Sequence, residues 1–120
     1  MKDDSVENWV RQNLYALLAY TRTADRIVEE GSAHYMLDES SQMLAELVLR
    51  KVGDAAARLP AEFTDAHPEV PWRAMIQARE VLARHPGRID PVLLWNTLSH
   101  KLPGAVAQVR AILAELIAGT

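Results

Sequence analysis

Residues 70–88, VPWRAMIQAREVLARHPGR, indicate the class of fold because apolar side chains recur at helical spacing between two breaks. Pro71 suits the first turn of a helix, where a missing backbone N–H breaks no hydrogen bond. Pro86 and Gly87 end the pattern, since a proline pushes the residue before it out of the α region. The segment therefore predicts a helix from about Pro71 to Arg84.

The same spacing extends over the rest of the chain. We expect one helix from Asp4 or Ser5 to Gly31, and a second that starts between Asp38 and Ser41, buries Leu44 among other apolar residues and ends at Pro60. A short helical turn at residues 61–66 is compatible with the pattern. A further helix begins at Asp90, and Pro103 separates it from a last helix. No stretch alternates strictly as a half-buried strand would.

These observations predict an all-α protein, a single up-and-down bundle of four to five helices over residues 1–120. The composition, 49% hydrophobic and 24% charged, is that of a folded globular protein. The absence of cysteine excludes disulfides, thiolate metal sites and a cysteine nucleophile. The N-terminal residues lack the apolar core of a signal peptide, and no apolar run reaches the ~18 residues of a membrane span. We expect a cytoplasmic protein that does not enter a membrane.

The charge of the chain is unevenly distributed. In residues 70–88 four arginines against one glutamate give +3, whereas nine Lys and Arg against fifteen Asp and Glu elsewhere give −6. The four arginines are Arg73, Arg79, Arg84 and Arg88, and His85 stands among them. Such a cluster favours a phosphate-bearing partner, and a solvated arginine face on an ordinary helix is the alternative.

Arg79 is the least ordinary of these arginines. It falls three and four residues after Ile76 and Met75, within an apolar stripe that also holds Trp72, Leu82 and Ala83. Because a guanidinium cannot shed its proton, an arginine on a buried face needs a carboxylate, carbonyl or phosphate partner. The residues alone are compatible with two partners for Arg79: a carboxylate in an internal salt bridge, or a bound ligand.

Several kinds of site are not supported by the sequence. The four histidines, His34, His67, His85 and His100, show no spacing that presents two metal ligands on one helical face. The carboxylates form no paired set on a buried stripe, and no phosphate-binding loop, nucleophile elbow or dinucleotide fingerprint occurs. We therefore expect neither a metal nor a cofactor. His85, at the end of the predicted helix, is the candidate acid or base.

Four pieces of the sequence together resemble the HepT-like branch of the HEPN superfamily. They are AAARLP from Ala55, HPEVPWR from His67, Ile89 followed by Trp95, and Leu102-Pro103. The resemblance covers residues 47–116. It implies a small helical bundle that forms a homodimer, and many family members are endoribonuclease toxins paired with a minimal nucleotidyltransferase antitoxin.

The family motif implies roles for individual residues. Its typical form is Arg-Asn-x-x-x-His-x-Tyr, and two dimer-related Arg and His pairs form a metal-independent cleft for RNA. Carried over, Arg79 becomes the cation that stabilises the transition state and His85 the acid or base. The resemblance leaves the RNA-binding roles to the remaining basic side chains of the cluster, namely Arg73, Arg84 and Arg88.

This chain departs from the motif at three positions. Glu80 replaces the asparagine, Arg84 stands where the histidine is commonest, and Pro86 replaces the tyrosine, so His85 comes one residue late. Some antitoxins of the family add AMP to that tyrosine, and this modification cannot operate here. Two alternatives to an active toxin follow: a catalytically degenerate homodimer that binds a nucleotidyltransferase partner, or an unrelated helical interaction module.

Overall fold

The computed structural model describes residues 4–119, and within them the chain is helical with no strand. The elements are α1 (Asp4–Glu29), α2 (Ser32–Leu37), α3 (Glu39–Ala57), α4 (Ala61–Ala66), α5 (Trp72–Arg84), α6 (Pro91–Asn96), the π-helical turn η1 (Thr97–Lys101) and α7 (Leu102–Ala118). The prediction of an all-α bundle is confirmed. Four long helices form the bundle, and the short helices α2, α4 and α6 join them.

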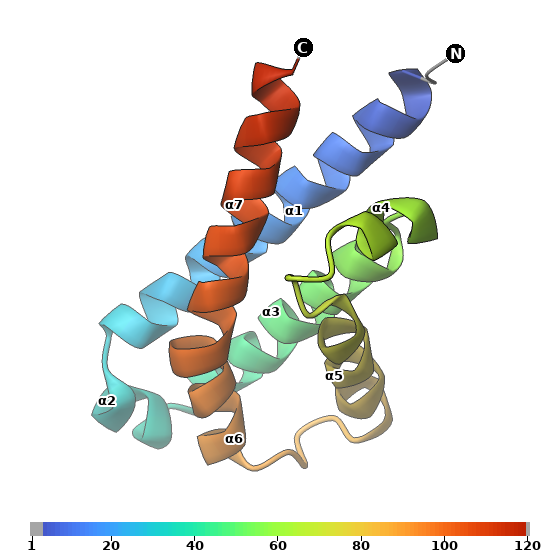
Figure 1. Cartoon of the computed structure of the whole chain (residues 1–120). Helices are drawn as coiled ribbons and strands as arrows, with labels where there is room; N and C mark the ends of the chain where they lie inside the picture. Colours follow the sequence, from blue (N-terminus) through green and yellow to red (C-terminus); the bar gives the residue numbers. More distant parts are fainter. Residues whose placement is uncertain (1–3, 120) are drawn as a thin grey trace.

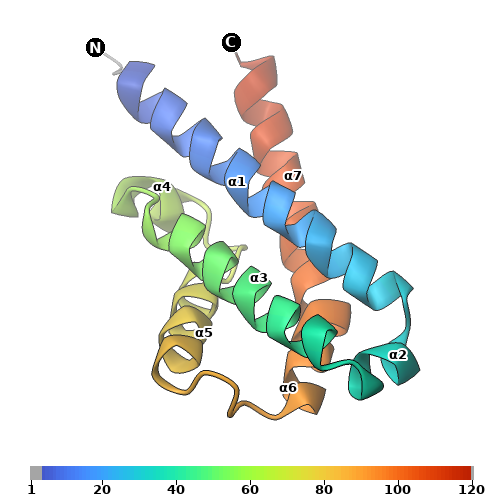
Figure 2. The same ribbon diagram turned by 180° about the vertical axis from the view of Figure 1, so that it is seen from behind.

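Helix α3 lies at the centre of the arrangement. It packs against α1 on one side and α5 on the other, while α7 packs against α1 (Figures 1 and 2). The start of α1 and the end of α7 lie at the same end of the molecule (Figures 1 and 2). Because α5 makes its main contacts with α3, the packing of these two helices largely sets the position of the side chains on α5.

The N-terminus of α3 is fixed by Asp38. The Asp38 carboxylate accepts hydrogen bonds from the Ser40 backbone N–H at 3.3 Å and the Ser41 hydroxyl at 2.8 Å. The Ser41 hydrogen bond, together with the Ser40 amide and His34, lowers the pKa of Asp38. The predicted start of this helix is confirmed. The prediction that Leu44 is buried is wrong, since Leu44 is 40% exposed and the buried side of α3 centres on Ala45, Val48 and Val52.

The C-terminal part of the chain differs from the prediction. Pro103 does not separate two helices, because α6, η1 and α7 follow one another without a break from Pro91 to Ala118. At the wide turn the Leu102 N–H bonds the Thr97 carbonyl, five residues back, as in a π-helix. A proline disrupts the regular α pattern because it lacks an N–H and crowds the preceding turn, and the wide turn accommodates it.

Helix α5 has the predicted extent. It ends at Arg84, and His85 leaves the helical region at φ −130° and ψ 57° before Pro86. Trp72, Met75 and Leu82 are buried as expected, whereas Ala83 is exposed, although it follows the buried Leu82 directly. Among the described residues, no helix is long and apolar enough to cross a membrane.

Candidate functional site

The site around Arg79 begins at a close contact between α3 and α5. A Cβ atom added to Gly53 of α3 would collide with the Cβ of Arg79 and would lie 2.6 Å from the Met75 carbonyl oxygen. Gly53 is buried in the C-terminal part of α3, and glycine inside a helix costs roughly 0.5–1 kcal/mol relative to alanine. The glycine therefore permits a close approach of the helices that places the base of the Arg79 side chain.

The Arg79 guanidinium is held by two carboxylates. It lies 3.5 Å from Asp54 across the helix interface and 3.9 Å from Glu80 on its own helix. The Arg79 side chain is 30% exposed, so its inner part is buried while solvent still reaches it. The internal salt bridge considered from the sequence is thus present, and it leaves the guanidinium accessible to a ligand.

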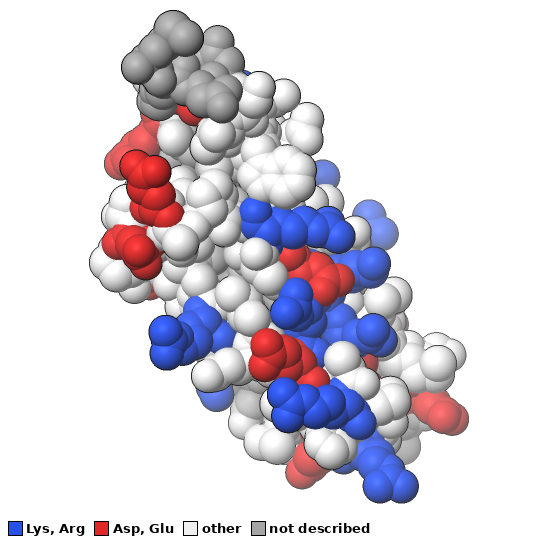
Figure 3. All heavy atoms as spheres, turned by 90° about the vertical axis from the view of Figure 1, so that its right-hand side faces the viewer, with Lys and Arg blue, Asp and Glu red and all other residues white. Residues whose placement is uncertain are grey.

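Glu80 also connects Arg79 to Arg84. A Glu80 oxygen lies 3.7 Å from the Arg84 guanidinium, one helical turn further along α5. On the face that carries α4 and α5, Lys and Arg side chains gather with Asp and Glu side chains between them (Figure 3). This face therefore offers cations to a polyanion, although its own carboxylates partly neutralise them.

His85 and Arg88 lie beyond the end of α5. His85 is exposed, and its backbone N–H donates to the Val81 carbonyl at 3.1 Å. Among the described residues it forms no hydrogen bond or ion pair with Arg79. Gly87, at φ +72°, donates its N–H to a Glu46 oxygen of α3 at 3.1 Å, which fixes the loop. Arg88 is exposed beside Gly87 and lines a cavity of about 250 Å³ with residues of α3 and α6.

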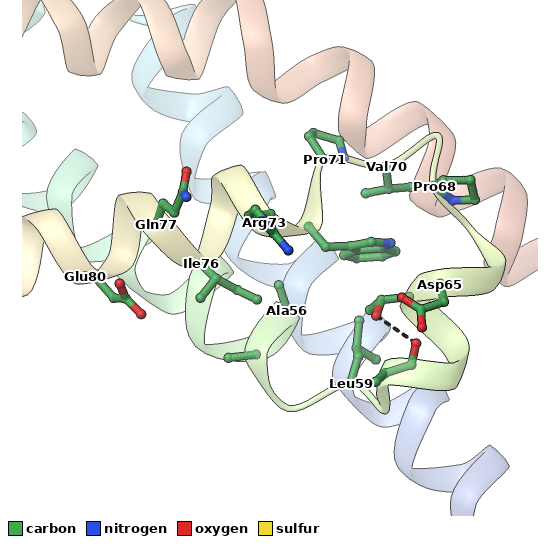
Figure 4. A pocket seen from close by; sticks show the side chains of 14 residues that line it. Ala56, Leu59, Asp65, Pro68, Val70, Pro71, Arg73, Ile76, Gln77 and Glu80 are labelled. Atoms are coloured by element: carbon green, nitrogen blue, oxygen red, sulfur yellow. Dashed lines mark hydrogen bonds between the residues drawn. The ribbon is translucent and has the colours of Figure 1, made fainter.

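Arg73 lies at the opposite end of α5. It lines a groove of about 750 Å³ between α4, α5 and the end of α3 (Figure 4). At ~1.5 Å per residue, Arg73 and Arg84 are about 16 Å apart along the helix axis. The structure thus brings Arg79, Glu80 and Arg84 together, places His85 and Arg88 at the end of the same helix, and separates Arg73 from them.

Three residues of this site were not identified from the sequence. Asp54 pairs with Arg79, Gly53 permits the close helix contact, and Glu46 anchors the loop after α5. A glycine inside a helix was the available signal, because it can mark a close approach of another element. Nothing in the sequence pairs Asp54 with Arg79, since the two residues lie on different helices.

Taken together, the fold and the site define a small all-α protein with a basic helix face. Residues 17–112 match the family described as "Ribonuclease HepT-like", and the chain belongs to this family. The resemblance drawn from its motifs is therefore confirmed.

Relatives with ribonuclease names support this assignment. A Methanocaldococcus jannaschii protein provisionally named an RNase is 26% identical over 82 residues, which cover 68% of each chain. The "Probable ribonuclease HepT" of Thermococcus cleftensis is 30% identical over 69 residues, 58% of this chain and 63% of that protein. A Caldanaerobacter subterraneus protein, also provisionally named an RNase, is 31% identical over 67 residues, 56% of this chain and 60% of that protein. No solved structure matches the chain.

Proposed function

We propose that this protein is a metal-independent endoribonuclease that acts as the toxin of a toxin–antitoxin pair. The observation that carries the proposal is the position of Arg79. Its guanidinium is oriented by Asp54 at 3.5 Å, and the Arg79 side chain as a whole remains 30% exposed, on a helix that also carries Arg84. A cation held in a fixed, solvent-accessible place can stabilise the extra negative charge on phosphorus in the transition state.

In the proposed reaction, His85 transfers the protons. The 2′-oxygen of the ribose forms a bond to phosphorus as the bond from phosphorus to the leaving oxygen breaks. His85 removes the proton of the 2′-hydroxyl or gives a proton to the leaving oxygen, and Arg79 stabilises the phosphorane-like transition state. Arg73, Arg84 and Arg88 hold the flanking phosphates. Since no hydrogen bond or ion pair joins His85 to Arg79 within one chain, we propose that a homodimer brings two Arg79 and His85 pairs to one cleft and so completes the site.

The proposed partner is a minimal nucleotidyltransferase antitoxin. The family's usual acceptor of AMP is a tyrosine two residues after the motif histidine, and Pro86 occupies that place here. The tyrosines of this chain, Tyr15, Tyr20 and Tyr35, lie in α1 and α2, away from α5. We therefore propose that the antitoxin inhibits this protein by a route other than modification of that tyrosine.

RNA cleavage in EDTA tests the proposal. Arg79→Ala and His85→Ala should each lower the cleavage rate of the purified protein by about 100-fold or more, the usual contribution of a charge-stabilising or proton-transferring group. Arg110→Ala is the matched control, because Arg110 is exposed on α7 and should be dispensable. In a bacterial host, growth arrest that persists in both α5 variants would contradict the catalytic assignment.

A second candidate function is favoured by the carboxylates around Arg79. Asp54 and Glu80 already pair with its guanidinium, and Glu80 replaces a neutral asparagine of the family motif. Such a site suits a catalytically degenerate homodimer that serves only to bind its nucleotidyltransferase partner. This alternative predicts no cleavage by the wild-type protein and a partner complex that survives Arg79→Ala.

A further inference from the structure

The groove beside Arg73 has an apolar floor and polar walls. Among the apolar side chains that line it, Leu59, Val70 and Trp72 are buried and Ile76 of α5 is half-buried. Figure 4 labels Leu59, Val70 and Ile76 in this lining. The polar side chains that line it come from two helices, with Thr64 and Asp65 from α4 and Arg73, Gln77 and Glu80 from α5. Its volume of about 750 Å³ is in the range of small-molecule sites, which is roughly 300–1,000 Å³.

The walls of the groove are held in place before any ligand binds. The Trp72 indole N–H donates to the His67 carbonyl at 3.0 Å, which ties the start of α5 to the end of α4. Phe63 packs its ring 4.7 Å from that of His67 and 6.0 Å from that of Trp72, measured between ring centroids. A preformed site loses less entropy on binding than a mobile one.

The groove leads toward the cations of the candidate site. Arg73, Gln77, Glu80 and Arg84 follow one another at intervals of four, three and four residues, so they lie in a row along one side of α5. The first three line the groove, and the fourth pairs with Glu80 next to Arg79. A nucleotide whose base lies in the groove can therefore extend its phosphate along this row toward Arg84, and Glu80 within the row also pairs with Arg79.

The charges of the groove favour a nucleobase over a phosphate. One cation, Arg73, faces two carboxylates, Asp65 and Glu80, and Glu80 is already engaged by Arg79 and Arg84. Among the described residues, neither Asp65 nor Gln77 has a hydrogen bond or ion pair through its side chain. The Asp65 carboxylate and the Gln77 amide are therefore available to a ligand beside an apolar floor. Such a site suits a flat ring that carries N–H donors.

We propose that this groove binds the nucleobase next to the cleaved phosphate and prefers guanine. The Watson–Crick edge of guanine presents two neighbouring N–H donors, and a carboxylate can accept both at once. Adenine, cytosine and uracil present no such adjacent pair. Asp65 is the acceptor that reads this edge, and Gln77 binds a further edge of the same base. The inference names the substrate preference of the proposed ribonuclease site and so rests on that function.

Binding of 2′-O-methyl oligonucleotides tests the groove separately from cleavage, since they lack the 2′-hydroxyl that the reaction needs. The probes are short uridine oligomers that carry one guanosine or one inosine, which lacks only the exocyclic amino group. The guanosine probe should bind the wild-type protein about tenfold more tightly by fluorescence anisotropy. Asp65→Asn should abolish this difference, and Asp25→Asn on exposed α1 should keep it.

The outcomes separate the two proposals. A guanosine preference that is absent from the wild type, or that persists in Asp65→Asn with an unchanged circular dichroism spectrum, overturns the inference. A third outcome is that Asp65→Asn binds both probes as the wild type does but no longer binds the co-expressed partner protein. This outcome would mean that the groove binds a protein, and it would also overturn the inference. An Asp65-dependent preference without RNA cleavage supports the groove and contradicts the proposed function. RNA cleavage that depends on Arg79, without a guanosine preference, supports the proposed function and contradicts the inference about the groove.

Discussion

Arg79 lies between two carboxylates of different origin, Asp54 across the α3–α5 interface and Glu80 in the next position of the chain. Ion pairs that remain partly exposed contribute roughly 0–1 kcal/mol each. They are strong enough to orient a guanidinium and weak enough for a phosphate to displace. The same contacts are therefore compatible with two roles for Arg79: a cation oriented to bind RNA, or a cation whose charge is neutralised by Asp54 and Glu80.

Glu80→Gln distinguishes these two roles at the level of one side chain. The variant removes a negative charge between Arg79 and Arg84, so RNA affinity should rise about twofold to fivefold at low salt. Fluorescence anisotropy with 2′-O-methyl RNA at two salt concentrations measures the change. Glu115→Gln, on the exposed side of α7, should leave the affinity nearly unchanged. Weaker binding by Glu80→Gln would mean that Glu80 positions the two arginines.

Tyr35 gives a pH-dependent prediction. Its side chain is buried, and its hydroxyl donates to the Pro91 carbonyl at 2.9 Å, which ties α2 to α6. Burial, with the nearby charges of Glu46 and Asp90, raises the pKa of Tyr35 from 10.0 to about 12. A raised acid pKa means that the folded state keeps a proton that the unfolded state loses. The contribution of Tyr35 to stability is therefore complete below about pH 10 and is lost as the pH rises through about 12.

The Tyr35→Phe variant measures this contribution. The difference between the ultraviolet titrations of the wild type and the variant should show one phenol with a midpoint near pH 12. At neutral pH the variant should lose about 1 kcal/mol of unfolding free energy in urea, because the Pro91 carbonyl loses its donor. A difference titration centred near pH 10 would contradict the buried, hydrogen-bonded phenol.

At the scale of elements, the contact of α3 with α5 depends on Gly53. Gly53→Ala should destabilise the protein by about 1–3 kcal/mol, since the new methyl group would overlap Arg79 and approach the Met75 carbonyl. Urea unfolding followed by circular dichroism measures the loss. Gly104→Ala in α7 is the matched control: nothing lies within 4 Å of an added Cβ there, so the variant should gain about 0.5–1 kcal/mol. Equal effects at the two sites would contradict the close helix contact.

Some helix boundaries could be predicted from neighbouring residues in the sequence, and others could not. The bounds of α5 follow from Pro71 and Pro86, because a proline acts through its own ring on adjacent residues. The prediction that Pro103 separates two helices was wrong because the effect of this proline does not depend on adjacent residues alone. The wide turn η1 accommodates it, and apolar residues of the adjoining helix pack into the core. Helix α2 was not predicted, since its six residues are too few to show a helical period.

At the scale of the whole molecule, the surface suited to a dimer contact lies on α3 and not on the apolar stripe of α5. Trp72 and Met75 are buried within one chain, so their stripe needs no second copy to cover it. Apolar side chains are instead exposed in the first half of α3, where Met43 is 65%, Leu44 40% and Leu47 46% exposed. These three residues lie near one another on the helix surface and are suited to a contact between proteins.

Light scattering after size-exclusion chromatography tests the dimer. The wild-type protein should elute at about twice the 13.4 kDa mass of the chain at micromolar concentration. Leu47→Glu should shift the mass toward the monomer without loss of helical content, because this side chain lies outside the core. A monomeric wild type would remove the proposed two-chain cleft and would favour the interaction-module alternative.

The sequence by itself determined the helical class, most helix ends and the family, because helical spacing, prolines and short motifs act over a few neighbouring residues. It also singled out Arg79 on an apolar stripe. Only the tertiary structure decided which groups surround that arginine. Asp54 and Gly53 reach it from another helix, and the groove with Asp65 and Gln77 arises where α4 and α5 meet. Such contacts depend on how whole helices pack, which no local pattern in the chain records.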